Sequence, residues 1–219
     1  MSSPSAGISL RISEIFYSLQ GETSRVGIPT TFIRLTGCPL RCAYCDTTYA
    51  FSGGNSMTLD EIMQSVKTHP TSYVCVTGGE PLAQKGCTAL LKALCDAGYN
   101  VSLETSGALD VSAVDARVAK VLDIKTPASG EIMKNYWENL AHLNAQDEIK
   151  FVLCDEGDYR WAKQVLQTHL LTEKCVVLFS PAQGQLEARN LAEWILRDGL
   201  QVRLQVQLHK LLWGNQQGK

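Results

Sequence analysis

Three cysteines, Cys38, Cys42 and Cys45, form a C-x3-C-x2-C array directly after an apolar segment. Thiolates are the usual protein ligands of zinc ions and iron–sulfur clusters, and this short spacing lets all three converge on one centre. A structural zinc ion takes four protein ligands and an iron–sulfur cube has four irons, so three thiols leave one corner open. We interpret this open coordination position as the functional feature of the site. A zinc ion completed by His69 is the alternative.

Length and composition predict one globular domain over residues 1–219. The net charge of −2 and the lack of a Lys/Arg cluster argue against nucleic acid as a partner. No apolar run reaches the roughly 20 residues of a membrane helix, and the first residues show no basic leader, so we expect a cytoplasmic protein without membrane contact. Thiols stay reduced in that compartment. The other cysteines lie in apolar patterns typical of small buried side chains: Cys75, Cys87, Cys95, Cys154 and Cys175.

The segments that must position the array alternate between strand and helix patterns. Strands are predicted at 8–12, 31–36, 73–77, 101–104, 118–125, 149–153, 176–179 and 202–206, and helices from 59 and around 90–94, 136–143, 161–166 and 191–195. Thr58 and Glu61 have the spacing of a capping box at the start of the first helix. Such alternation predicts an α/β protein with a mainly parallel sheet of about six core strands, either open or curled into a full or partial barrel.

Five polar or glycine-rich stretches fall where a predicted strand ends. They are the cysteine array, Gly78–Pro81, Glu104–Gly107, Asp123–Lys125 and Ser180–Pro181. In parallel α/β sheets the ligand site forms at the carboxyl ends of the strands, so these stretches are expected to line one rim. Taken alone, Gly78–Pro81 also fits a simple strand-to-helix turn.

The cysteine array, followed one strand later by Gly-Gly-Glu-Pro, resembles the radical S-adenosylmethionine (SAM) superfamily. The resemblance implies an incomplete barrel of the TIM type. It also implies a [4Fe–4S] cluster on the three cysteines, with SAM on the fourth iron, cleaved by one electron to give a 5′-deoxyadenosyl radical. Members of one family within this superfamily often have Ser-Pro-Lys where this chain has Asp-Ile-Lys, so only the lysine matches. The residues that the resemblance assigns to SAM are Gly78, Gly79, Glu80, Ser106, Asp123, Ile124, Lys125 and Ser180.

Four further stretches, Leu19–Glu22, Phe32–Arg34, Cys45–Thr47 and Leu208–Asn215, are together similar to the 7-carboxy-7-deazaguanine synthase family over nearly the whole chain. That family converts 6-carboxy-5,6,7,8-tetrahydropterin to 7-carboxy-7-deazaguanine with loss of ammonia, on the route to queuosine. The resemblance implies a homodimer, an electron donor such as flavodoxin or ferredoxin, and Mg²⁺ on Thr47. The implied contacts to the pterin are Leu19, Gln20, Gly21, Glu22, Arg34, Thr77 and His209.

Two other functions stay open at this point. The first is a radical SAM activase that forms a glycyl radical on a partner enzyme; the segments 20–22 and 208–215 argue against it. The second is a zinc-stabilised binding module. Single residues also have simpler explanations. Arg34 is also consistent with a surface ion pair, and Glu22 and Thr47 are also consistent with turn residues. His209 is also consistent with a purely structural histidine.

Overall fold

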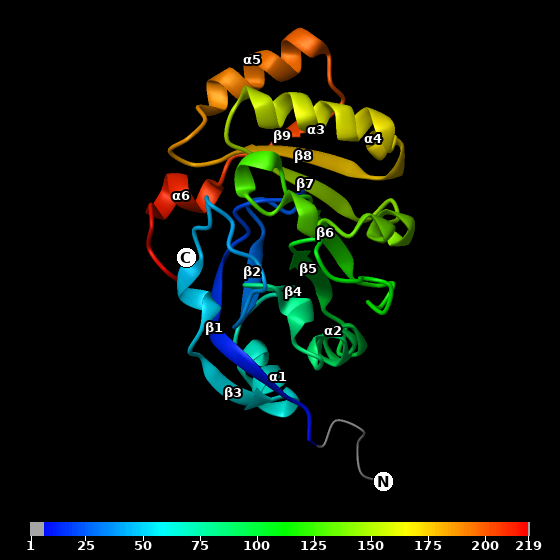
Figure 1. The fold of residues 1–219 in the computed structure, drawn as a ribbon. Helices are drawn as coiled ribbons and strands as arrows, with labels where there is room; N and C mark the ends of the chain where they lie inside the picture. Colours follow the sequence, from blue (N-terminus) through cyan, green and yellow to red (C-terminus); the bar gives the residue numbers. More distant parts are fainter. Residues whose placement is uncertain (1–6, 219) are drawn as a thin grey trace.

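The computed structural model describes residues 7–218, in which nine strands form one sheet of order β3-β1-β2-β4-β5-β6-β7-β8-β9 (Figure 1). The strands are β1 Ser9–Leu19, β2 Pro29–Leu35, β3 Asn55–Thr58, β4 Tyr73–Gly78, β5 Asn100–Thr105, β6 Ala119–Asp123, β7 Glu148–Leu153, β8 Val176–Pro181 and β9 Arg203–Leu204. From β2 to β9 all neighbours are parallel, whereas β1 is antiparallel to β2 and β3. The sheet does not close on itself, which confirms the expected incomplete barrel.

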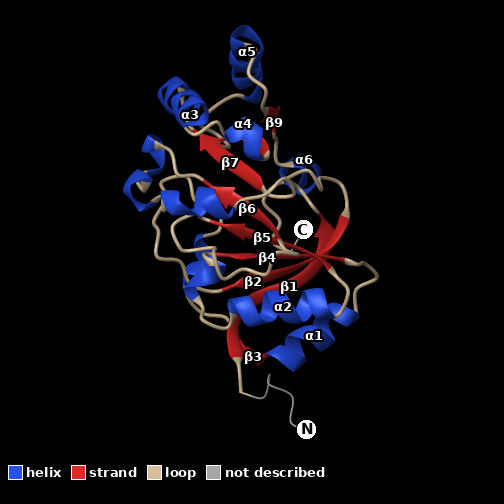
Figure 2. Cartoon of the chain, turned by 90° about the vertical axis from the view of Figure 1, so that its right-hand side faces the viewer, coloured by secondary structure: helices blue, strands red, loops and turns tan. Residues whose placement is uncertain are grey.

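Helices connect most of the parallel strands (Figure 2), but the connection from β5 to β6 has none and that from β6 to β7 has only 3-10 turns. They are α1 Leu59–Lys67, α2 Cys87–Asp96, α3 Glu156–Thr168, α4 Leu171–Lys174, α5 Ala188–Asp198 and α6 Leu208–Trp213, with 3-10 turns η1 Thr48–Phe51, η2 Pro81–Ala83, η3 Pro127–Ser129, η4 Ile132–Lys134 and η5 Trp137–His142. The capping box of α1 is present, since Glu61 N donates to Thr58 Oγ1 at 3.3 Å and Thr58 N donates to Glu61 Oε2 at 2.7 Å. Among the described residues, no helix is long and apolar enough to cross a membrane.

Two local predictions need correction. The segment 136–143 forms the 3-10 turn η5 rather than an α-helix. Its buried Asn139 side chain donates to the carbonyls of Gly107 and Leu109, so the segment is anchored to the loop after β5. The segment that begins at Asn55, for which no strand was predicted, forms β3, which pairs with the first residues of β1 and covers that edge.

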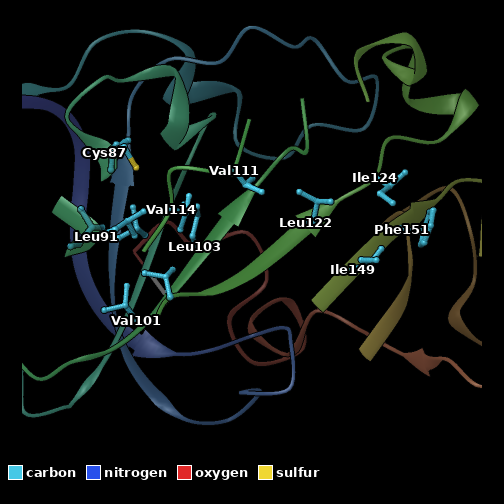
Figure 3. Packing of buried hydrophobic residues seen from close by; sticks show 14 of the residues in the cluster. Cys87, Leu91, Val101, Leu103, Val111, Val114, Leu122, Ile124, Ile149 and Phe151 are labelled. Carbon is cyan, nitrogen blue, oxygen red and sulfur yellow. The ribbon is translucent and has the colours of Figure 1, made fainter. Parts of the chain in front are cut away.

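The hydrophobic core lies between the helices and one face of the sheet. Alternate strand residues such as Leu103, Leu122 and Phe151 point into it, together with Leu91 of α2 (Figure 3). Strand side chains alternate between the two faces, so this set leaves the other face for different residues. Of the five cysteines outside the array, Cys75, Cys87 and Cys154 are buried as expected, and the other two are half-buried.

The second face of the sheet is polar near the carboxyl ends of the strands. A parallel sheet that packs helices on both faces carries apolar residues on both. Here each of these parallel strands presents at least one ionisable or hydroxyl side chain to a shared cavity, among them Arg34 of β2, Thr77 of β4, Glu104 of β5, Asp123 of β6, Lys150 of β7 and Ser180 of β8. This face is therefore built to bind a polar ligand.

Candidate active site

A cavity of about 690 Å³ lies at the carboxyl ends of the parallel strands. It collects most of the residues that the sequence singled out, from segments spread over almost the entire chain. The predicted residues that line it are Leu19, Gln20, Gly21, Glu22, Arg34, Cys38, Cys42, Cys45, Thr47, Thr77, Gly78, Gly79, Ser106, Asp123, Lys125, Ser180 and His209.

Two predicted residues, Glu80 and Ile124, do not line the cavity. The Ile124 side chain belongs to the hydrophobic core behind the sheet (Figure 3). The Glu80 carboxylate is fully buried and accepts hydrogen bonds from the Thr105 hydroxyl at 2.9 Å and from the backbone N–H of Ser106 at 2.6 Å. Glu80 therefore joins the ends of β4 and β5 from behind the cavity wall.

The cysteine loop is fixed to the end of β4 by backbone hydrogen bonds. Glu80 N donates to Gly37 O at 2.8 Å, and Leu40 is buried beneath the loop. A Cβ on Gly79 would lie 2.3 Å from Gly37 O and 2.8 Å from the Cβ of Cys38, so only glycine allows this approach. On the other side of the loop, Ala43 N donates to Ser129 O at 3.0 Å.

The three thiols are half-buried at the cavity wall. Burial raises the pKa of the Cys42 thiol to about 11, and it also raises the pKa of Cys38. Free of metal, the Cys38 and Cys42 thiols carry protons, so loading a metal centre releases protons. Three soft sulfur donors beside a large open cavity fit a [4Fe–4S] cluster with one iron left for a ligand.

The structure separates His69 from the cysteines. Its Nδ1 atom lies 3.2 Å from Thr31 Oγ1 near the start of β2, and its ring stacks on Tyr17. The cysteines follow the opposite end of β2, so His69 is not a fourth ligand. Within residues 7–218, no three His, Cys, Asp or Glu side chains are arranged to hold a single metal ion.

Buried polar atoms without a protein partner gather beside the cysteine loop. Across the part of the chain that the structure describes, four such side-chain atoms exist, and Tyr44 Oη, Asp123 Oδ1 and Ser180 Oγ among them belong to cavity residues. Lys125 Nζ pairs with the other oxygen of Asp123 at 2.9 Å. Unpaired buried polar groups are costly, so hydroxyl and carboxylate groups here suit a polar ligand such as SAM.

Glu22 lies in the loop between β1 and β2, and both of its carboxylate oxygens have partners. Oε2 contacts the ammonium of Lys150, and Oε1 accepts from Gln207 Nε2 at 2.8 Å. Burial alone would raise the pKa of Glu22, but the Lys150 charge and the two hydrogen bonds hold that pKa below its usual value. Glu22 is therefore ionised at neutral pH.

Arg34 and Glu104 lie on neighbouring parts of the same polar face. Arg34 Nε donates to Glu14 at 2.7 Å, and this contact leaves the two terminal nitrogens of its guanidinium free to bind a carboxylate. Glu104 accepts from Thr77 Oγ1 at 2.9 Å and from Gln20 Nε2 at 3.3 Å. Gln20 and Thr77 are thus joined through Glu104, whereas Arg34 pairs with Glu14 outside this hydrogen-bonded group.

The carboxyl-terminal segment reaches the cavity beside the end of β1, where α6 lies (Figure 1). Leu208 N donates to Gly21 O at 2.9 Å. A Cβ on Gly21 would lie 2.0 Å from His209 Nδ1, so glycine is required for this contact. Burial lowers the pKa of His209, so its imidazole is neutral at pH 7.

Thr47 lies at the cavity with its hydroxyl 2.8 Å from Asp46 Oδ1, to which it donates. Gln207 Nε2 lies 3.3 Å and Lys210 Nζ 3.6 Å from the second oxygen of Asp46. Hydroxyl and carboxylate oxygens together form a hard donor set of the kind that Mg²⁺ prefers.

Several polar residues of the cavity were not among the predicted site residues, including Lys150, Gln207, Asp46 and Tyr44. Lys150 carried a signal, because a lysine inside the apolar strand pattern at 149–153 is unusual unless its side chain has a partner. Asp46 and Tyr44 stand inside the cysteine segment itself. For Gln207, nothing local in the sequence pointed to the cavity.

The open parallel sheet and its three-thiol cavity define a radical SAM protein, and the model of the Radical SAM superfamily matches residues 32–125. Such a protein uses a [4Fe–4S] cluster and SAM. The 7-carboxy-7-deazaguanine synthase of Chlorobaculum tepidum is 52% identical over 207 residues, covering 93% of this chain and 94% of that protein. The enzyme of the same name from Koribacter versatilis is 44% identical, covering 93% and 97%. The chain therefore belongs to the 7-carboxy-7-deazaguanine synthase family.

A solved structure agrees with this fold. The crystal structure of QueE from Escherichia coli matches with a TM-score of 0.78, covering 95% of this chain and 100% of that one at 22% identity. The likeness covers nearly the whole chain, and at this identity it concerns the fold alone.

Proposed function

We propose that this chain is a carbon–nitrogen lyase that converts 6-carboxy-5,6,7,8-tetrahydropterin to 7-carboxy-7-deazaguanine with release of ammonia. The observation that carries the proposal is a single cavity that contains both the three-thiol loop and the loop of Glu22. Family membership at 52% identity over nearly the full chain supports the same reaction. The glycyl-radical activase is not favoured, because segments 20–22 and 208–215 line or close this cavity.

In this proposal, Cys38, Cys42 and Cys45 hold the cluster. When bound, the cluster and SAM supply the radical chemistry that removes a hydrogen atom from the substrate. The wall of the SAM site is formed by Gly78, Gly79, Ser106, Asp123, Lys125 and Ser180. Glu80 and Ile124 support that wall from behind, since neither side chain lines the cavity.

The substrate ring binds between the loop after β1 and the polar face of the sheet. The ionised Glu22 accepts hydrogen bonds from the N–H edge of the pterin, and Arg34 binds its carboxylate with a planar fork. Thr77 and Gln20 both donate hydrogen bonds to Glu104 and extend the set of substrate-binding residues. Leu19, Gly21 and the neutral His209 complete the wall on the side of α6.

Thr47 contributes one oxygen ligand to a Mg²⁺ ion that orients the substrate carboxylate. The neighbouring Asp46 carboxylate supplies a second hard oxygen and a compensating charge. Waters and the substrate fill the other positions of a Mg²⁺ ion bound in this manner.

We further propose an oligomeric state, an electron donor and a cellular compartment for the enzyme. Residues 1–219 form one domain, and two copies associate so that the short edge strand β9 and the exposed Leu211 and Leu212 of α6 are covered. A flavodoxin or ferredoxin delivers the electron in the cytoplasm, where the free thiols of the cluster loop stay reduced. Nucleic acid is not a partner.

A product assay tests the function. The chain, with its cluster reconstituted under anaerobic conditions, is incubated with carboxytetrahydropterin, SAM, Mg²⁺ and a reductant. Mass spectrometry should detect 7-carboxy-7-deazaguanine and one released ammonia per product. A reduced and intact cluster without any deazaguanine would contradict the proposal, and a colourless protein with stoichiometric zinc would favour the binding module.

A further inference from the structure

Lys150 is a largely buried cation of the cavity that no sequence motif explains. It lies in β7, where its backbone pairs with Asp123 of β6, and its side chain is 16% exposed. Its ammonium contacts the Glu22 carboxylate, whose side chain is 12% exposed. A lysine is rarely buried unless it is paired, so this contact accounts for its presence in the strand.

Gln207 meets the same carboxylate from the opposite end of the chain. Its Nε2 donates to Glu22 Oε1 at 2.8 Å, whereas Lys150 contacts Oε2. The hydrogen bond from Leu208 N to Gly21 O fixes Gln207 beside the loop. Glu22 N in turn donates to Gln20 Oε1 at 3.2 Å, so backbone and side chain of Glu22 are both held.

We propose that Lys150 and Gln207 are positioning residues that hold the Glu22 carboxylate in one orientation for two N–H donors of the substrate ring. A carboxylate has about four lone-pair sites, and these two residues occupy one on each oxygen. One site per oxygen stays free, which matches the paired N–H donors of a guanidine-like ring edge. The inference rests on the proposed function, because it assigns the ring edge to Glu22.

The charges around the cavity explain why a cation is needed here. Asp46, Glu104 and Asp123 line the same cavity as Glu22, so carboxylates outnumber the cations Arg34, Lys125 and Lys150. Without Lys150, burial and the charge of Asp46 would favour a proton on Glu22. A protonated carboxyl presents a donor where the ring edge also presents donors, and the match is lost.

A second buried ion pair supplies a matched control. Lys120 of β6 pairs with Asp147 at 2.9 Å, with side chains 4% and 0% exposed. This pair lies near the amino ends of β6 and β7 and does not line the cavity. It has the same Lys–carboxylate chemistry as the Lys150–Glu22 pair and is buried more deeply, but neither of its side chains contacts the cavity.

The decisive experiment measures kinetics and equilibrium binding of carboxytetrahydropterin for reconstituted variants. Lys150→Met should raise KM and the substrate Kd by about tenfold or more, because one charge-assisted contact is lost, while iron content and SAM affinity stay normal. Lys150→Arg should recover most of the affinity. Gln207→Leu should raise KM by about threefold, and Lys120→Met should lower stability without changing KM.

A double mutant tests whether Lys150 acts on substrate binding through Glu22. In a Glu22→Gln background, Lys150→Met should leave KM within about twofold of Glu22→Gln alone, because Lys150 then has no carboxylate to orient. A full additional loss in the double mutant would overturn the inference, as would an unchanged KM in Lys150→Met. If the parent forms product and these variants behave otherwise, only the inference fails. If the parent neither binds nor converts the pterin, the proposed function fails as well.

Discussion

The cysteine loop and the Glu22 site open onto one cavity. The residues that form the loop are close together in the sequence, whereas those that hold Glu22 are far from it in the sequence. The loop draws its thiols from eight consecutive residues, Cys38 to Cys45, and its backbone is fixed by the next parallel strand. Glu22 is held by residues 128 and 185 positions away. We call the cysteine loop and the strand end at Gly79 the cofactor half of the cavity, and the loop of Glu22 with its partners the substrate half. The cofactor half therefore depends on local spacing. The substrate half depends on contacts between the first loop and distant parts of the chain.

Removing a thiol should have the largest effect, because it breaks the proposed cofactor half at its centre. Cys42→Ala should lose the iron–sulfur cluster and all product formation, since two thiolates from this loop do not hold a cube. Iron and sulfide content and the visible spectrum measure the loss. Cys87→Ala is the control: Cys87 is fully buried outside the cavity, so its replacement should keep normal iron content. A full cluster in Cys42→Ala would refute the ligand assignment.

Gly79→Ala disturbs the backbone contact between the end of β4 and the cysteine loop. Its Cβ would lie 2.3 Å from Gly37 O, so the end of β4 and the cysteine loop must separate. Overpacking of this kind costs about 2 kcal/mol, and we expect a loss of that size in the unfolding free energy of the metal-free chain. Iron content and SAM affinity should fall together. Normal values of both would show that the loop tolerates the shift.

Gly21→Ala makes the corresponding change in the other half. Its Cβ would lie 2.0 Å from His209 Nδ1, so the imidazole ring has to move. We expect KM for the pterin to rise about tenfold, with iron content and SAM affinity unchanged, because only the substrate wall is disturbed. In a His209→Ala background, Gly21→Ala should add little. A loss of cluster in Gly21→Ala would erase the distinction between the two halves.

The smallest effect is expected at the boundary between the halves. Thr47→Ala should keep the cluster but weaken the stimulation of product formation by Mg²⁺ several-fold, because one of several oxygen ligands is removed. The measurement is a titration of activity with Mg²⁺ after treatment with a chelator. A variant that responds to Mg²⁺ as the parent does would contradict the metal assignment.

Much of the fold was accessible from periodicity and turn residues. The capping box at Thr58 and Glu61 and the strand pattern at 73–77 are short-range features, and each appears in the structure as predicted. The 3-10 turn η5 was not accessible, because a buried Asn139 amide that bonds to the loop after β5 decides its form. The pairing of β3 with β1 likewise depends on residues about 45 positions apart.

The sequence by itself determined which residues are available for chemistry: three thiols at fixed spacing, a glycine-rich strand end, and the Gln20–Glu22 segment. Only the tertiary structure decided which of them meet. It turned Glu80 away from the cavity, and it brought Lys150 and Gln207 onto the two oxygens of Glu22. The reason is physical: spacing within one loop fixes local geometry, but contacts between distant residues follow from the register of parallel strands and the path of the chain.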